Sequence, residues 1–321
     1  MKNKILIIGG DPNSVNSEII YKSWKKSSPG IKNKIYVITN YRLFKKQLLK
    51  LKYPLKIIKV QNHKDHQKTK KLKIIDIPIK FDNPFKIKKK FAINFISKSL
   101  NYAHTAALKN DVKGIINCAI NKSLLKKDNI GITEYLASKC KVKNQSEVMM
   151  ISNLKFSVVL ITTHIKVRQI SKKISKKIII NKIKTIDKFF KNTFKIKPKI
   201  GVLGLNPHNA EMKKKSEETK IILPSIRQLK KIKINCSGPH VSDTIFIKDY
   251  KNFDVIVGMF HDQVLIPFKT LYKFNAINIT LGLKYLRVSP DHGTAVNLIG
   301  KNKANADSLI KCIHFIKKFG K

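Results

Sequence analysis

Acidic residues are scarce in this chain of 321 residues, and so are arginines. The chain has 19 Asp and Glu residues against 67 Lys and Arg residues, which gives a formal net charge of +48 at pH 7. Only four basic residues are arginines, the side chain that makes bidentate contacts with bases, and the lysines are scattered without interleaved aromatics. We therefore expect no specific nucleic-acid partner. Lysine, isoleucine and asparagine are abundant and have AT-rich codons, so codon bias is a sufficient explanation of the charge.

Long apolar runs and paired cysteines are missing too. No apolar run reaches the roughly 18 residues that a membrane span needs, so we expect no membrane partner. The four cysteines lie far apart and form no CxxC pair, which is typical of a reduced cytoplasmic protein. The segment "MKNKILIIGGDP" has a short apolar core and no small-residue cleavage site, and it is interpreted as a first strand. These features predict a cytoplasmic location.

Short runs rich in β-branched residues alternate with longer, lysine-rich helical patterns. Continuous apolar strands between helices favour an α/β fold in which both faces of the sheet are covered. The length allows two lobes, because single cores tend to stop growing near ~250–300 residues. The segment from Pro54 to Pro84 is polar and weakly patterned, and we expect a loop or an edge region there. Strands are predicted at Lys4–Gly9, Lys34–Thr39, Gly114–Ile120, Lys155–His164, Lys199–His208 and Phe253–His261, and helices at Phe91–Lys109 and Ile178–Phe194.

Three of these strands end at a histidine, in "VVLITTH", "VLGLNPH" and "VIVGMFH". Ligands of open α/β folds bind at the carboxyl ends of strands, where three imidazoles suit a divalent metal with an open coordination position. The alternative is a set of unrelated loop histidines. Because the chain has only nine histidines, the shared context favours a metal site made by His164, His208 and His261.

The segment that follows His261 contains several residues suited to binding anions. Lys269 and Arg287 suit a phosphate or a carboxylate, and Asn278 adds a neutral hydrogen bond. An ordinary solvated lysine is the alternative for Lys269. Arg287 is harder to explain in that way, because the chain uses lysine almost everywhere else.

These motifs together resemble the 4-hydroxythreonine-4-phosphate dehydrogenase family of vitamin B6 biosynthesis. No single motif is decisive, but the set is specific and covers nearly the whole chain. The segments that match the family in order and spacing are "GGDPNSVNSEI", "NCAINKSLL", "GITEYLA", "ITTHIKVRQI", "GLNPHNAE", "GPHVSDTIF", "MFHDQVLIPFK" and "NITLGLKYLRVSPDHGTA".

The resemblance implies a two-lobed α/β/α fold similar to the isocitrate and isopropylmalate dehydrogenases, with a cleft between the lobes. It assigns residues 1–130 and about 280–321 to a first, discontinuous lobe, and about 131–279 to a second lobe that carries the three histidines. It also implies a homodimer with a shared active site. The chain has no GxGxxG fingerprint, so a classical Rossmann fold is not expected.

The resemblance further implies the roles of the site residues. The three histidines hold a divalent metal, zinc in the first place and magnesium or cobalt as alternatives. His261, Asp262 and Lys269 are the catalytic candidates, with Asp262 orienting ligands or taking part in proton transfer, whereas the general base stays unassigned. The substrate-binding set is Ile132, Thr133, Lys269, Asn278 and Arg287, and NAD or NADP lies against Asp291, His292, Gly293 and Thr294.

The chain departs from the family pattern at a few positions. Ile132 stands where the family has a substrate-contacting histidine, and isoleucine neither donates nor accepts a hydrogen bond. Ser14 and Asn16 replace small, flexible residues, and glycines are missing from "NPHNAE" and after "HDQ". We expect retained chemistry with a changed or weakened substrate site.

The expected reaction is the NAD(P)-dependent oxidation of 4-phosphooxy-L-threonine, a small phosphorylated amino acid. Its β-keto acid product loses carbon dioxide to give 3-amino-2-oxopropyl phosphate, with the metal as Lewis acid. One alternative is the oxidation of erythronate or threonate 4-phosphate, which the loss of the histidine at Ile132 leaves open. The other is a basic nucleic-acid-binding protein on a decayed enzyme scaffold, against which the scattered lysines and intact ligand residues speak.

Overall fold

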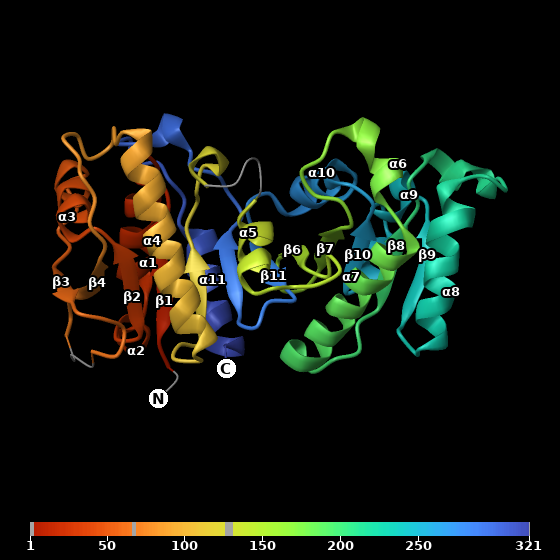
Figure 1. The fold of residues 1–321 in the computed structure, drawn as a ribbon, viewed down its shortest axis with the longest axis horizontal. Coiled ribbons are helices and arrows are strands. Elements are labelled where there is room, and N and C mark those ends of the chain that lie inside the picture. The colour runs from red at the N-terminus through yellow and green to blue at the C-terminus, as the bar shows by residue number, and fades with distance from the viewer. Residues whose placement is uncertain (1–2, 66–68, 126–130, 321) are drawn as a thin grey trace. The chain divides into compact units, whose positions relative to one another are not determined.

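The structure, a computed structural model, describes residues 3–65, 69–125 and 131–320. The chain divides into two compact units, each built from strands and helices (Figure 1). The first unit runs up to Ile132 and resumes at Lys284, and the second comprises Thr133–Leu283. The α/β class predicted from the alternating pattern is confirmed.

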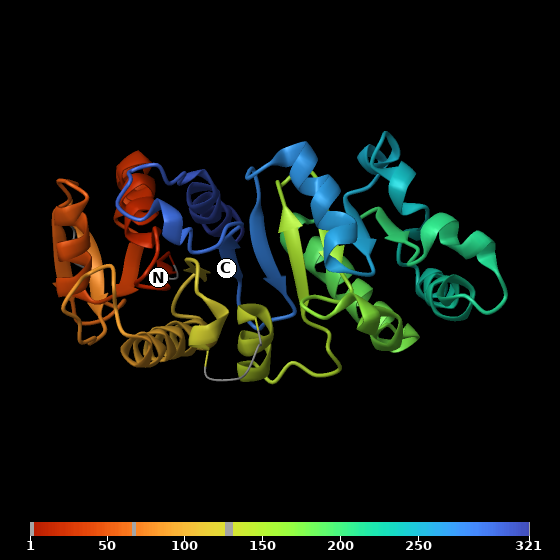
Figure 2. The same ribbon diagram turned by 90° about the horizontal axis from the view of Figure 1, so that it is seen from above.

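The first unit is a parallel sheet with helices on both faces. Its strands are β1 (Ile5–Ile8), β2 (Ile35–Thr39), β3 (Ile57–Val60), β4 (Leu72–Asp76), β5 (Gly114–Asn117) and β12 (Arg287–Pro290). Its helices are α1 (Asn16–Lys26), α2 (Pro29–Lys32), α3 (Tyr41–Lys50), α4 (Lys89–Leu108) and α11 (Asp307–Phe319), with 3-10 turns at Lys122–Leu124 and Val296–Leu298. The strand order is β3-β4-β2-β1-β5-β12, and each of these neighbouring pairs is parallel. Figure 2 shows α4 on one face and α1 and α11 on the other, which explains why β1, β2, β5 and β12 are buried throughout.

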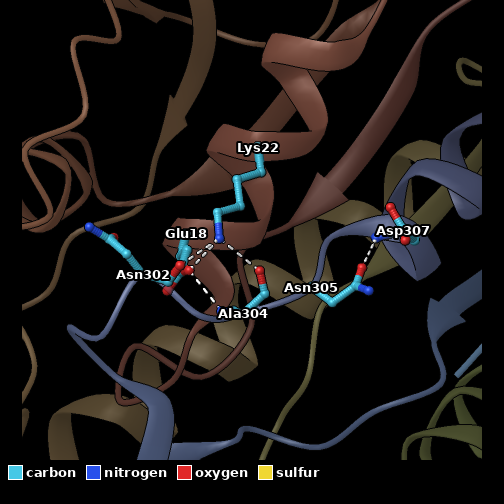
Figure 3. A network of polar contacts seen from close by, with 6 residues as sticks. All are labelled: Glu18, Lys22, Asn302, Ala304, Asn305 and Asp307. Atoms are coloured by element: carbon cyan, nitrogen blue, oxygen red, sulfur yellow. Dashed lines mark hydrogen bonds and ion pairs between the residues drawn. The ribbon is translucent and has the colours of Figure 1, made fainter.

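A buried carboxylate joins α1 to the segment that leads into α11 (Figure 3). Glu18 is 1% exposed. Its Oε1 accepts hydrogen bonds from Lys22 Nζ at 2.6 Å and from the Ala304 N–H at 2.9 Å. Lys22 Nζ also donates to the carbonyl oxygens of Asn302 and Ala304. These contacts hold the returning C-terminal segment of the unit against its first helix.

The turn between β1 and α1 passes close to the segment that leaves β5. Gly10 has a φ of +74°, and a Cβ at this position would lie 2.5 Å from the Ala119 carbonyl oxygen. The Asn16 side-chain amide donates to the same carbonyl at 2.8 Å, and the Ser14 hydroxyl donates to the Asp11 carbonyl at 2.5 Å. Ser14 and Asn16 therefore replace flexibility with hydrogen bonds that hold the turn.

The second unit combines antiparallel and parallel strand pairs. Its strands are β6 (Val148–Ser152), β7 (Ser157–Leu160), β8 (Ile200–Leu203), β9 (Cys236–His240), β10 (Val255–Gly258) and β11 (Ile277–Leu281). They follow the order β11-β6-β7-β10-β8-β9, in which β11–β6 and β6–β7 are antiparallel and the other pairs are parallel. The helices are α5, which starts at the unit boundary (Ile132–Lys139), α6 (Ile170–Lys173), α7 (Lys176–Phe189), α8 (Leu223–Lys231), α9 (Ser242–Ile245) and α10 (His261–Tyr272). Shorter helical segments lie at Val167–Gln169, Phe190–Phe194, Glu218–Ile222 and Asp249–Asn252.

The six strands predicted from the sequence are confirmed, although several end earlier than predicted. The assignment of Pro54 to Pro84 to a loop or an edge was wrong for β4, which pairs with both β2 and β3. The misleading signal is Lys73, which is 3% exposed in the middle of β4 and donates from Nζ to the Asn33 carbonyl at 2.9 Å. Because its ammonium group is hydrogen-bonded to a carbonyl far along the chain, this lysine can be buried in the strand. In the sequence it interrupts the apolar pattern that would otherwise predict a buried strand.

The four cysteines are free and buried. In the described parts of the chain, no helix is both long and apolar enough to cross a membrane.

Candidate active site

The three predicted metal-binding histidines follow three neighbouring strands of the second unit. Strand β10 lies between β7 and β8 and is parallel to both. His164 comes four residues after β7, His208 five after β8, and His261 three after β10. Because parallel strands end at the same edge of a sheet, the strand order brings the three segments that carry these histidines to one edge.

His261 is the first residue of α10, and its ring is oriented by the next residue. Its Nδ1 lies 2.6 Å from Asp262 Oδ1. An ionised carboxylate only accepts hydrogen bonds, so Nδ1 carries the proton, and in the neutral form of the ring Nε2 has the lone pair that a metal or a substrate can use. The His164 ring lies beside it, with 5.9 Å between the ring centroids. The structure thus brings together two of the three predicted ligands.

Hydrogen bonds join the segments that carry His164 and His261. The Thr162 hydroxyl and N–H both donate to the Met259 carbonyl, at 2.7 and 3.0 Å. The Gln263 side chain accepts the Met259 N–H at 2.6 Å and donates to the Gly204 carbonyl at 2.7 Å. Gln263 therefore ties the end of β10 to the segment after β8, which leads to His208.

The segment that carries His208 has an unusual backbone. His208 and the three residues that follow have positive φ values, between 45° and 56°. Leu205 and Asn206 lie just before this stretch, and their N–H groups each donate a hydrogen bond to Glu218 Oε1 at 2.8 Å. Burial alone would raise the pKa of Glu218, but these donors outweigh it and the pKa is lowered. A buried carboxylate thus fixes the start of the segment.

The histidines do not form a complete metal cage within one chain. Among the described residues, no group of three or more His, Cys, Asp and Glu side chains lies close enough together to hold a metal ion. The donor chemistry nevertheless fits one, since neutral imidazole is a common ligand of zinc and its neighbours in the transition series.

Three of the predicted substrate residues lie in the second unit. Thr133 Oγ1 lies 3.2 Å from Thr280 Oγ1, and Asn278 is two residues from Thr280 on β11, so these two residues point to the same face of the strand. Asn278 Oδ1 is buried and has no hydrogen-bond partner among the described residues, so it is able to accept a hydrogen bond from a bound molecule. Lys269, on α10, has its Nζ 5.7 Å from the centre of the Phe274 ring.

A pocket of about 290 Å³ lies beside Thr133 in the same unit. Lys182, which is 6% exposed, donates from Nζ to the Glu147 carbonyl at 2.6 Å, and burial lowers its pKa. The pocket is lined by Thr133, Glu134, Gln145, Glu147, Met149, Ile161, Thr162, Thr163, Ile165, Lys173, Ile178 and Lys182.

The remaining predicted residues belong to the first unit. Arg287, on β12, is 2% exposed, and its Nε donates to Asn117 Oδ1 at 2.5 Å. The side chain of one of the four arginines is therefore buried and hydrogen-bonded within the first unit. Ile132 is partly buried at the start of α5.

The predicted dinucleotide-binding loop follows β12. The Asp291 N–H donates to the Ser308 hydroxyl at 3.0 Å, and the Thr294 carbonyl accepts the Val15 N–H at 3.2 Å. His292 Nδ1 lies 2.9 Å from the Gly293 carbonyl oxygen. This loop therefore lies against the turn that precedes α1.

Three supporting residues near the site were not predicted from the sequence. Gln263 and Glu218 hold the segments of the histidines, and Glu134 accepts a hydrogen bond from the Thr163 hydroxyl at 2.9 Å. Each is a polar residue close to a motif, but the contact that gives it a role comes from another part of the chain. Local pattern carries no signal for such contacts.

Comparison with known proteins shows the family of the chain. Residues 31–316 match the family described as pyridoxal phosphate biosynthetic protein PdxA. The chain is 35% identical to the 4-hydroxythreonine-4-phosphate dehydrogenase of Sulfurihydrogenibium sp. over 97% of this chain and 96% of the relative. It is 36% identical to that of Aquifex aeolicus over 99% and 98%.

Solved structures agree with this assignment. The 4-hydroxythreonine-4-phosphate dehydrogenase of Klebsiella pneumoniae superimposes with a TM-score of 0.85 and 26% identity, over 98% of both chains. Isocitrate dehydrogenase from Methylococcus capsulatus superimposes with a TM-score of 0.52 and 12% identity, over 98% of this chain and 85% of that chain. This likeness shows the fold alone, and it confirms the expected fold class. On the sequence match and the shared fold, the chain belongs to the PdxA family of pyridoxal phosphate biosynthetic proteins.

Proposed function

We propose that the protein is a 4-hydroxythreonine-4-phosphate dehydrogenase of vitamin B6 biosynthesis, an oxidoreductase that uses NAD or NADP. The observation that carries the proposal is the placement of His164, His208 and His261 after three neighbouring parallel strands, in a chain that spans nearly the full length of its relatives. The proposed substrate is 4-phosphooxy-L-threonine. The proposed final product is 3-amino-2-oxopropyl phosphate, formed when the oxidised β-keto acid loses carbon dioxide.

The three histidines would hold a divalent metal, zinc by preference and magnesium or cobalt as alternatives. When bound, such a metal supplies a Lewis acid for a hydroxyl or carbonyl oxygen. Asp262 holds the proton on His261 Nδ1 and so keeps Nε2 available. Because the described part of a single chain lacks a complete cage, we propose a homodimer in which a metal site is shared between subunits.

The substrate's anionic groups suit Lys269 and Arg287, and its polar groups suit Thr133 and Asn278. The unpartnered Asn278 Oδ1 accepts a hydrogen bond from a substrate hydroxyl or ammonium group in this proposal. The dinucleotide would be held by Asp291, His292, Gly293 and Thr294, and its nicotinamide would supply the hydride acceptor. Ile132 would remove one polar contact with the substrate. We also propose that the enzyme is located in the cytoplasm.

Absorbance at 340 nm tests the proposal directly. Purified protein, stripped of metal and then supplied with zinc, magnesium or cobalt, should form NADH or NADPH from 4-phosphooxy-L-threonine only when metal is present. His261→Ala should lower kcat/KM at least about 100-fold, because the metal contributes several kcal/mol to such reactions. The exposed His314→Ala on α11 is the matched control and should keep full activity. Activity only on erythronate or threonate 4-phosphate, or full activity in metal-free His261→Ala, would refute the proposal.

A further inference from the structure

Glu134 lies where the segment that carries His164 meets the first turn of α5. It directly follows Thr133, and its Oε1 accepts the Thr163 hydroxyl at 2.9 Å. Thr163 immediately precedes His164. The hydrogen bond therefore links the neighbour of a predicted substrate residue, Thr133, to the neighbour of a predicted metal ligand, His164.

The backbone around His164 makes this contact consequential. The Thr163 carbonyl accepts the N–H of Ile165 at 3.1 Å, which closes a tight turn with His164 at its centre. On the preceding side, Thr162 is bonded to the Met259 carbonyl. The Thr163 side chain is thus the link that fixes the turn to α5, while Thr162 fixes it to the segment of His261.

The second carboxylate oxygen of Glu134 is also informative. Glu134 Oε2 is buried, and no described residue forms a hydrogen bond with it. Burying a carboxylate with one oxygen that lacks a hydrogen bond costs free energy, so a purely structural role would not explain Glu134 well. Acidic residues are also rare in this chain, which has only 19 of them. Glu147 lines the same pocket as Glu134, so it provides a nearby acid for comparison.

We propose that Glu134 is a positioning residue that holds His164 in the orientation needed for metal binding, acting through the Thr163 hydroxyl. The inference rests on the proposed function, because it concerns the metal site of that function. It adds a specific carboxylate and a specific hydroxyl to the set of residues on which the metal affinity depends.

Zinc affinity of the metal-stripped full chain, measured by competition with a chromophoric chelator, tests this role. Glu134→Ala and Thr163→Val should each weaken zinc binding about tenfold, the lower end of the effect of residues that orient metal ligands. The double variant should bind no more weakly than either single variant, since both changes break the same contact. Thr163→Ser and Glu134→Gln keep a hydroxyl and an acceptor oxygen, and should retain most of the affinity.

The controls separate positioning from general destabilisation. Glu147→Gln should bind zinc like the wild type, and the thermal unfolding of each metal-free variant shows whether it is folded. If Glu134→Ala does not fold, the pair Thr163→Val and Thr163→Ser carries the test. Unchanged zinc affinity in folded Glu134→Ala or Thr163→Val, or losses that multiply in the double variant, would overturn the role of Glu134. Absence of zinc binding by the wild type would instead refute the proposed metal site, and the inference with it.

Discussion

At the scale of single residues, Ile132 is the position at which we expect a polar contact with the substrate to be missing. It is partly buried at the start of α5, next to Thr133. We expect Ile132→His to raise kcat/KM for 4-phosphooxy-L-threonine about tenfold, because one hydrogen bond to an ionised group contributes about 1.5–3 kcal/mol. Steady-state kinetics with a saturating nicotinamide cofactor would measure the change.

Ile132→Leu is the matched control, since it keeps the position apolar and should leave kcat/KM within about twofold of the wild type, as a volume-conserving swap. An unchanged or lower kcat/KM in a folded Ile132→His protein would mean that the substrate site has been rebuilt around isoleucine.

At the scale of elements, the turn between β1 and α1 shows how a departure from the family pattern is compensated. Asn16 is 2% exposed, and its amide donates to the Ala119 and Asp11 carbonyls at 2.8 and 3.4 Å. We expect Asn16→Gly to lower the free energy of unfolding by about 1–2 kcal/mol, because the Ala119 carbonyl keeps only the Asp11 N–H as a donor and the helix start becomes more flexible. Urea unfolding followed by circular dichroism would measure it.

The exposed Asn252 provides a control, because Asn252→Gly changes flexibility without removing a buried donor. An Asn16→Gly protein as stable as the wild type would show that the two hydrogen bonds contribute nothing, and that either residue type suits the turn.

At the scale of the whole molecule, the charge is the dominant feature. With a net charge of +48, lysines repel one another over the surface, and salt screens this repulsion. The melting temperature should therefore rise as sodium chloride increases from about 0.05 M to about 0.5 M, a range over which the screening length falls from above 10 Å to below 5 Å.

Sodium chloride and potassium chloride should act alike, because screening depends on ionic strength rather than on the cation. A melting temperature that is flat or falls with salt would show that self-repulsion does not limit the stability of this chain.

The sequence alone determined the fold class, the six strands named from their apolar runs, and the three strands that lead to histidines. These features are local: a β-branched run forms a strand, and a helix pattern forms a helix, wherever they lie in the sheet. Strand β4 was not predicted, because a buried lysine interrupts its apolar pattern. The ends of the strands were not predicted accurately, because pairing with neighbouring strands decides where a strand ends.

Only the tertiary structure decided that β7, β10 and β8 are neighbours, and that Glu134 meets Thr163. It also decided that Asn16 donates to the carbonyl of Ala119, and that Asn278 Oδ1 has no hydrogen-bond partner in the described ranges. Strand order and contacts between distant residues depend on which surfaces bury each other, and a local pattern carries no record of that choice. Candidate ligands can therefore be named from the sequence, whereas the contacts around them come from the packed chain.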